Sequence, residues 1–282
     1  MTIFIAILLA GAMSSLYALS TSLQALEARR EPASDSLRAS LLKKLVRRRL
    51  WLAGTAAGVV AWPLQAIALS LASVAIVQPA LGLGLIVLLV LGVRLLHERV
   101  GPREVVGALL IAAAIAVIGW AAPAHTPGFT RGAESGVIAA LALAAAAPYG
   151  LRVLGRAGGL GTSISAGFGW AAVGLATALI DEAIAHRHWL VAVAWGIGVG
   201  AASWSSLLAE MTALQTWPAT RSIPVVFGIE MVLPAALLPV LTSTRPGHGL
   251  SFGAALAVAC AGAAVLGGSR AVARAAAPLT EP

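Results

Sequence analysis

Residues 74–95 read VAIVQPALGLGLIVLLVLGVRL, an apolar run whose first charged residue is Arg94. The hydrocarbon core of a bilayer is about 30 Å thick, and an α-helix that rises about 1.5 Å per residue crosses it with about 20 residues. Membrane-spanning strands are shorter and alternate apolar with polar residues, and this run does not alternate. The stretch therefore predicts a transmembrane α-helix.

Runs of the same kind recur along the whole chain. Of its 282 residues, 59% are hydrophobic and 11% are charged, and the mean hydropathy is +0.92. A soluble chain has about 25% charged residues, and a soluble fold of this length could not bury so much apolar surface. We predict an all-α membrane protein with nine transmembrane helices, at residues 3–23, 51–70, 74–95, 103–121, 133–153, 161–183, 188–213, 219–242 and 250–269.

The basic residues orient these spans. With nine spans the loops alternate between the two sides of the membrane, and 16 of the 19 Lys and Arg residues then fall on one side, leaving Arg131, Arg187 and Arg245 on the other. The positive-inside rule places the first side in the cytoplasm, so the N-terminus is expected outside and the C-terminus inside. No basic segment precedes residues 3–23, which we interpret as a retained span rather than a cleaved signal.

The same placement excludes a nucleic-acid partner. The net charge is +8, but the basic residues stand at the ends of apolar runs, as membrane orientation requires. Arg outnumbers Lys by 17 to 2, which is typical of a GC-rich bacterial genome. The expected location is therefore a bacterial plasma membrane, with the lipid bilayer as partner. The sequence does not choose between a monomer and a homodimer.

The long polar loop 22–50 carries an amphipathic pattern. Apolar residues recur there at helical spacing among five basic ones: Leu37, Leu41, Leu45 and Val46 alternate with Lys43, Lys44, Arg47, Arg48 and Arg49. A basic amphipathic helix of this kind is expected to lie on the inner leaflet. The alternative is a docking site for a partner protein.

The two halves of the chain resemble each other in order. Ala68-Leu69 is followed by Pro79, and Ala213-Leu214 is followed by Pro224 at an offset of 145 residues. Five predicted spans separate the two patterns, so equivalent helices would run in opposite directions. Inverted repeats, here residues 1–121 and 122–282, are a recurrent construction of secondary transporters, whose binding site lies near the midplane.

Three stretches of the first half also carry a family resemblance: residues 68–79 (ALSLASVAIVQP), 95–100 (LLHERV) and 104–111 (EVVGALLI). They resemble the drug/metabolite transporter superfamily with its EamA-type repeat. The nine-span count looks most like the NIPA-like branch, which implies magnesium transport. The second half departs from the pattern, because residues 242–246 (TSTRP) replace the charged turn.

One acidic residue lies near the middle of a predicted span and is the first candidate for function. An acid in an apolar helix is costly unless it faces protein or water, and Glu230 is that residue. Pro234 lacks an N–H and leaves the carbonyl of Glu230 without its helical donor, so carboxylate and carbonyl oxygens could together hold a proton or a hard cation. The alternative is a protonated Glu230 that bonds a neighbouring helix.

Five further residues are candidates for a solute or ion site: Gln65, Gln78, Trp204, Glu210 and Tyr17. Each has a structural alternative, since polar side chains also join helices and Glu210 is close enough to a helix end to reach water. The sequence contains neither a phosphate-binding GxxxxGK[ST] nor an HExxH motif, so neither an enzyme nor a cofactor is predicted. Its single Cys260 cannot form a disulfide within the chain.

The resulting expectation is a secondary transporter that moves a metabolite, drug or cation by alternating access. A magnesium or divalent-cation transporter, with Glu230 as a metal ligand, is the specific alternative. A membrane anchor or regulatory subunit that transports nothing is the second alternative.

Overall fold

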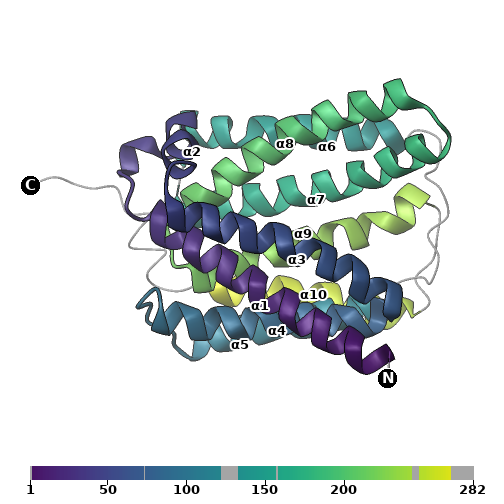
Figure 1. The fold of residues 1–282 in the computed structure, drawn as a ribbon, viewed down its shortest axis with the longest axis horizontal. Coiled ribbons are helices and arrows are strands. Elements are labelled where there is room, and N and C mark those ends of the chain that lie inside the picture. Colours follow the sequence, from purple (N-terminus) through teal and green to yellow (C-terminus); the bar gives the residue numbers. More distant parts are fainter. Residues whose placement is uncertain (1, 73, 122–132, 157, 243–247, 268–282) are drawn as a thin grey trace, which may run out of the picture.

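The computed structural model describes residues 2–72, 74–121, 133–156, 158–242 and 248–267. Every regular element within these residues is helical (Figure 1). The helices are α1 (Thr2–Ala28), the 3-10 turn η1 (Ala33–Asp35), α2 (Ala39–Leu45), α3 (Arg49–Leu71), α4 (Val74–Arg94), α5 (Pro102–Ala121), α6 (Ala133–Val153), α7 (Gly159–Ala185), α8 (Trp189–Thr216), α9 (Ala219–Thr242) and α10 (Gly249–Gly267).

The structure confirms the expected class of fold in its coarse form. Each predicted span coincides with one long helix, α1 or one of α3 to α10. Among the described residues six helices are long and apolar enough to cross a membrane, namely α1, α6, α7, α8, α9 and α10. Helices α3, α4 and α5 have 23, 21 and 20 residues but are not among these six. An all-helical chain compatible with several membrane crossings is thus established, and the count of nine remains a prediction.

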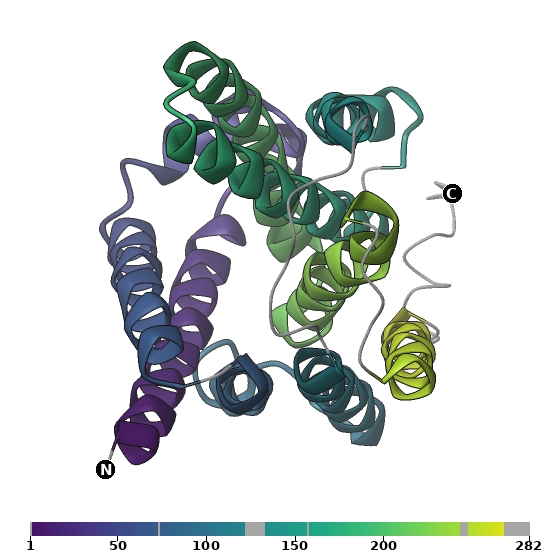
Figure 2. The same cartoon turned by 90° about the vertical axis from the view of Figure 1, so that its right-hand side faces the viewer.

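The long helices run side by side along one direction (Figure 1). Helix α1 packs on α3 and α4, while α6, α7 and α8 pack on one another in a second group (Figure 2). Helix α9 lies between them, in contact with α4, α5 and α10 on one side and with α7 and α8 on the other. Large apolar side chains such as Trp62, Leu190 and Ile197 face outward, which suits contact with lipid.

Small residues allow the closest helix contact between the halves. Helices α5 and α10 meet at Gly107 and Gly262, where a methyl group on Gly262 would stand 2.9 Å from the carbonyl oxygen of Gly107. Glycine at such crossings lets two helix backbones approach without intervening side chains.

Several loops gather at one end of the bundle, which we call the basic end. It contains residues 29–48, 95–101, 152–156 and 217–218, and the backbone N–H of Leu37 donates to Thr212 Oγ1 there at 2.9 Å. All Lys and Arg residues in the described part of the chain lie at this end except Arg187, which follows α7 at the other end. The structure therefore groups the basic loops as the alternation of spans predicts.

The amphipathic segment differs from the prediction. Leu41, Leu42 and Leu45 of α2 are at most 1% exposed, and they join the main core with side chains of α1, α3, α8 and α9. The expectation that this apolar face lies on the inner leaflet is therefore wrong, because protein covers it. Four apolar residues were predicted to form this face. Val46 is exposed, whereas Leu37, Leu41 and Leu45 are buried.

Candidate functional site

Two acidic side chains lie within electrostatic range of each other in the bundle. Glu210 of α8 is 8% exposed, and its Oε2 accepts a hydrogen bond from Trp170 Nε1 of α7 at 2.8 Å. Glu230 of α9 is half-buried and interacts electrostatically with Glu210 and with Tyr17 of α1. Three of the candidate residues, Tyr17, Glu210 and Glu230, thus come from three different helices, with Glu230 in electrostatic range of the other two.

Their depth follows from helix geometry. Tyr17 stands eleven residues before the end of α1, and Glu230 stands eleven residues after the start of α9. At about 1.5 Å per residue, both lie about 16 Å from the basic end, near the middle of the bundle. Glu210 is six residues from the end of α8, about 9 Å from the same end. The site therefore extends from the centre of the bundle toward the basic end.

Helix α7 contributes polar groups that the sequence did not single out. A methyl group on Gly169 would collide with Ser206 Oγ of α8, so α7 and α8 touch at this level. Because the two helices are antiparallel, Ser165, one turn before Gly169, faces the turn of α8 that carries Glu210. The Ser165 hydroxyl is buried and has no hydrogen-bond partner. The interface between α7 and α8 thus has an unused donor at the level of Glu210.

Helix α9 continues through Pro234, the residue whose missing N–H leaves the Glu230 carbonyl without a helical donor. Residues 229–237 are all half-buried. Since nine successive positions cover every face of a helix, this part of α9 is loosely surrounded on all sides. Carboxylate and carbonyl oxygens here are chemically suited to a proton or a hard cation. Within the described residues, no three His, Cys, Asp or Glu side chains group as metal ligands.

Of the other candidates, the structure describes the side chain of Trp204 alone. Trp204 is 46% exposed on the outside of α8, six residues from Glu210 and on a different face of the helix. It therefore does not form a wall beside Glu210. Gln65 and Gln78 belong to α3 and α4, but their side chains lie outside the described part of the structure.

A second polar cluster holds the first turn of α9 at the basic end. Both oxygens of Glu98 accept backbone N–H groups, from Ala219 at 2.7 Å and Thr220 at 2.9 Å, and Oε2 also accepts the Thr220 hydroxyl at 2.5 Å. The same carboxylate pairs with Arg29 at the end of α1. A carboxylate at a helix N-terminus satisfies free N–H groups and complements the helix dipole.

A second carboxylate supports the same turn. Glu104 of α5 accepts from Arg221 Nε at 2.7 Å, and it caps its own helix by accepting the Gly101 N–H at 2.7 Å. The Glu98 and Glu104 side chains are 4% and 5% exposed. Glu98 and the backbone N–H of Ala219 that it accepts are 121 residues apart in the sequence.

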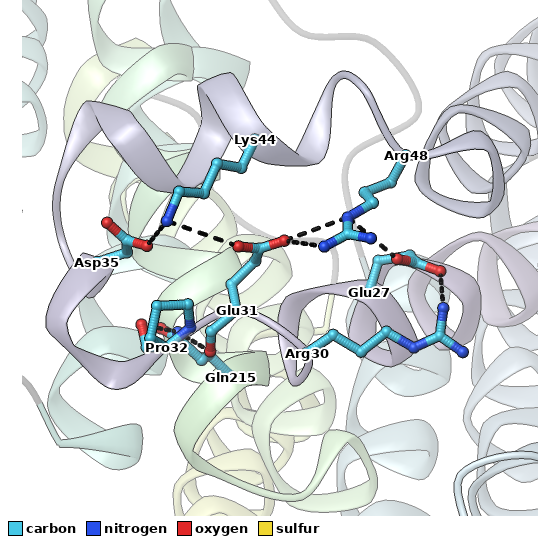
Figure 3. Close-up of polar contacts among 8 residues, drawn as sticks. All are labelled: Glu27, Arg30, Glu31, Pro32, Asp35, Lys44, Arg48 and Gln215. Atoms are coloured by element: carbon cyan, nitrogen blue, oxygen red, sulfur yellow. Dashed lines mark hydrogen bonds and ion pairs between the residues drawn. The ribbon is translucent and has the colours of Figure 1, made fainter.

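A third cluster ties α2 to the end of α1 (Figure 3). Arg48 pairs with Glu31 at 2.8 Å, and Lys44 pairs with Asp35 at 2.5 Å. The hydrogen bond from Lys44 lowers the pKa of Asp35, and the same bond raises the pKa of Lys44. Gln215 of α8 donates to the carbonyl oxygens of Glu31 and Pro32, both at 2.8 Å. These contacts explain why α2 lies on the protein.

We compared the chain with protein-family models, with curated proteins and with solved structures. None of the three comparisons gave a match. The comparisons therefore assign the chain to no family.

Proposed function

We propose that this chain is a secondary transporter of a small solute in a bacterial plasma membrane, working by alternating access about Glu210 and Glu230. The observation that carries the proposal is the presence of a buried Glu210, bonded to Trp170, and a half-buried Glu230 within electrostatic range of it and of Tyr17, among apolar helices. Ionised acids are costly in such a place and persist where they serve an ion or substrate path. In the described part of the chain, neither acid forms an ion pair with Lys or Arg.

The charge of the site indicates what it can bind. Two carboxylates within electrostatic range repel each other when both are ionised, so a proton or cation bound at either one would relieve the repulsion. Tyr17 and Trp170 add a hydroxyl, an indole N–H and two aromatic rings, and an aromatic face also attracts cations. We therefore favour a protonated or cationic cargo, or a neutral solute exchanged for protons.

The nine-span arrangement is part of the proposal. Helices α3, α4 and α5 are as long as a membrane crossing requires, and the gathering of basic loops at one end fits alternating spans with the N-terminus outside. The inverted repeat is supported by paired contacts: α1 packs on α3 as α7 packs on α8, α1 packs on α4 as α7 packs on α9, and the equivalent helices α5 and α10 pack on each other. The resemblance to drug/metabolite transporters fits the same plan.

Magnesium is the specific alternative cargo. Mg²⁺ usually keeps several waters and binds through one or two carboxylates, which Glu210 and Glu230 could supply. An organic cation would use the same charges together with the aromatic rings. The two cargoes differ in what they need, because only the organic cation gains from Trp170.

The decisive experiment uses purified protein in liposomes, with Mg²⁺ and a panel of amines and metabolites as probes and a pH dye inside. Glu230→Gln keeps the shape of the side chain and removes its charge. We expect it to reduce flux by about 100-fold or more, since the essential group is lost, while insertion and thermal unfolding are unchanged. The matched control is Asp181→Asn, an exposed acid at the other end of α7.

Full flux through Glu230→Gln would refute the assignment. The alternative, a non-transporting anchor or regulatory subunit, predicts no flux even in the unmodified protein. It also predicts loss of function on charge reversal of Arg47, Arg48 and Arg49, which are all exposed, although Arg48 also pairs with Glu31.

A further inference from the structure

The two ends of α9 differ sharply in how they are surrounded. Around Glu230, residues 229–237 are half-buried, whereas the first two turns are enclosed. Six residues of those turns are at most 1% exposed: Ala219, Thr220, Ser222, Ile223, Val225 and Val226. Any path from Glu230 along α9 to the basic end therefore passes through closely packed protein.

The contacts that enclose this end join the two halves of the chain. Glu98 and Glu104 belong to the first half and bind Ala219, Thr220 and Arg221 at the start of α9. The Cβ of a residue at position 92 would lie 3.7 Å from Thr220 Cβ, so the end of α4 touches the same turn. Charged groups at the junction of the two halves therefore help to enclose the start of α9.

Resting on the proposed transport function, we propose that Glu98 and Glu104 are the gate at the basic end, shown here closed. They hold the helix that carries Glu230, and their release lets the start of α9 move so that the site opens to that side. Alternating access requires such a closure on each side in turn.

The chemistry of the pairs suits opening and closing. A buried ion pair is costly to break when its charges stay in apolar surroundings. Here the partners reach the surface, since the Arg29 and Arg221 side chains are 27% and 15% exposed. Water at the end of the bundle can therefore hydrate each charge when the turn moves, and closure is reversible.

The test measures how readily a thiol below the gate is reached. In a Cys260→Ser background, Ser165→Cys places the probe on α7 at the level of Glu210 and loses no hydrogen bond. A membrane-impermeant maleimide is added to vesicles that expose the basic end. Glu98→Gln and Glu104→Gln remove the gate charges, and we expect each to speed labelling by about tenfold. Asp181→Asn, at the far end of α7, is the control and should leave the rate unchanged.

Equal labelling rates in the gate variants and the control would overturn the proposal. If the Gln variants do not fold, a second construction decides: Gly92→Cys with Thr220→Cys. The Cβ separation at these positions matches that of disulfides, about 3.5–4.5 Å. Oxidation should then suppress labelling of the Ser165→Cys site and reduction should restore it, whereas unchanged labelling under oxidation refutes the gate.

The assay needs no cargo, so its outcome is separate from that of the transport experiment. Slow labelling that the gate variants accelerate, together with full flux through Glu230→Gln, would keep the gate and reject the site. Loss of flux in Glu230→Gln with no effect of Glu98→Gln or Glu104→Gln on labelling would keep the transporter and reject the gate.

Discussion

Replacing Leu45 of α2 by Ala is expected to release this helix from the bundle. The Leu45 side chain has no exposed surface and belongs to the main core. Truncating a buried Leu to Ala costs about 2–5 kcal/mol, because the transfer free energy is lost and a cavity remains. Each 1.4 kcal/mol corresponds to a factor of about ten, so the equilibrium constant for detachment of α2 should rise roughly 30-fold to several thousand-fold.

Limited trypsin digestion of vesicles that expose the basic end measures this detachment. Lys43 and Arg47 supply cleavage sites within the segment, and cleavage of a transiently opened region follows the population of the open form. Mass spectrometry of the fragments gives the cleavage rate at these two sites. We expect Leu45→Ala to be cut far faster than the unmodified protein until the segment is fully detached.

The control lies on the next residue. Val46 is 46% exposed, and Val46→Ala should change the free energy of docking by about 0.5 kcal/mol at most, a change of roughly twofold in rate. Equal cleavage of Leu45→Ala and Val46→Ala would refute the reasoning. It would mean that lipid, not protein, covers the apolar face of α2, as the sequence first indicated.

Two further predictions concern packing and pH. Gly107→Ala places a methyl group 2.5 Å from Leu266 Cγ and should lower stability by about 1–3 kcal/mol, seen as a lower melting temperature in detergent, whereas Gly136→Ala, with open space around it, should not. The lowered pKa of Asp35 means that its pair with Lys44 stabilises the fold fully above pH of about 4 and is lost as the pH falls through the lowered value. In Asp35→Asn the melting temperature should therefore fall less between about pH 4 and pH 2 than in the unmodified protein. The same pH dependence of the melting temperature in both proteins would contradict this role.

The helices themselves could be predicted because they depend on local composition. Residues 133–153 and 219–242 were expected as spans and are the helices Ala133–Val153 and Ala219–Thr242. Helix α1 was expected to end at residue 23 and continues to Ala28, since good helix formers such as Leu26 and Glu27 carry it beyond the apolar run. The length of an apolar run therefore predicts where a helix crosses the membrane, but not the residue at which the helix ends.

The surroundings of a side chain were harder to predict than its position. An amphipathic pattern says that α2 has an apolar face, but lipid and protein satisfy it equally well. The charged residues contained a clue to the contact with protein. Glu27 and Glu31 are four residues apart, as are Lys44 and Arg48, so the acidic pair can form ion pairs with the basic pair. Those pairs show that the segment folds back on the protein.

The acidic site was predicted in part. Glu230 stood out because one charge in an apolar helix is conspicuous, whereas Glu210 was a candidate with a structural alternative, because it is close enough to the helix end to reach water. Trp170 was not considered, although a buried indole N–H needs an acceptor and so points to one. Which acceptor it finds depends on a neighbouring helix 40 residues away, and no local pattern contains that information.

The bonds at the basic end join parts of the chain that are synthesised at very different times. Arg29 Nε donates to the carbonyl oxygen of Leu214 at 3.3 Å, and Leu37 binds Thr212. A ribosome releases the N-terminal residues first, so these groups and the Glu98 carboxylate must wait for α8 and α9. The early helices can enter the membrane on their own apolar length, but this end of the protein is assembled only after α9, the ninth of the ten α-helices in the described part of the chain, has been made. Until then the Glu98 carboxylate lacks the N–H groups of Ala219 and Thr220 that it accepts in the finished protein.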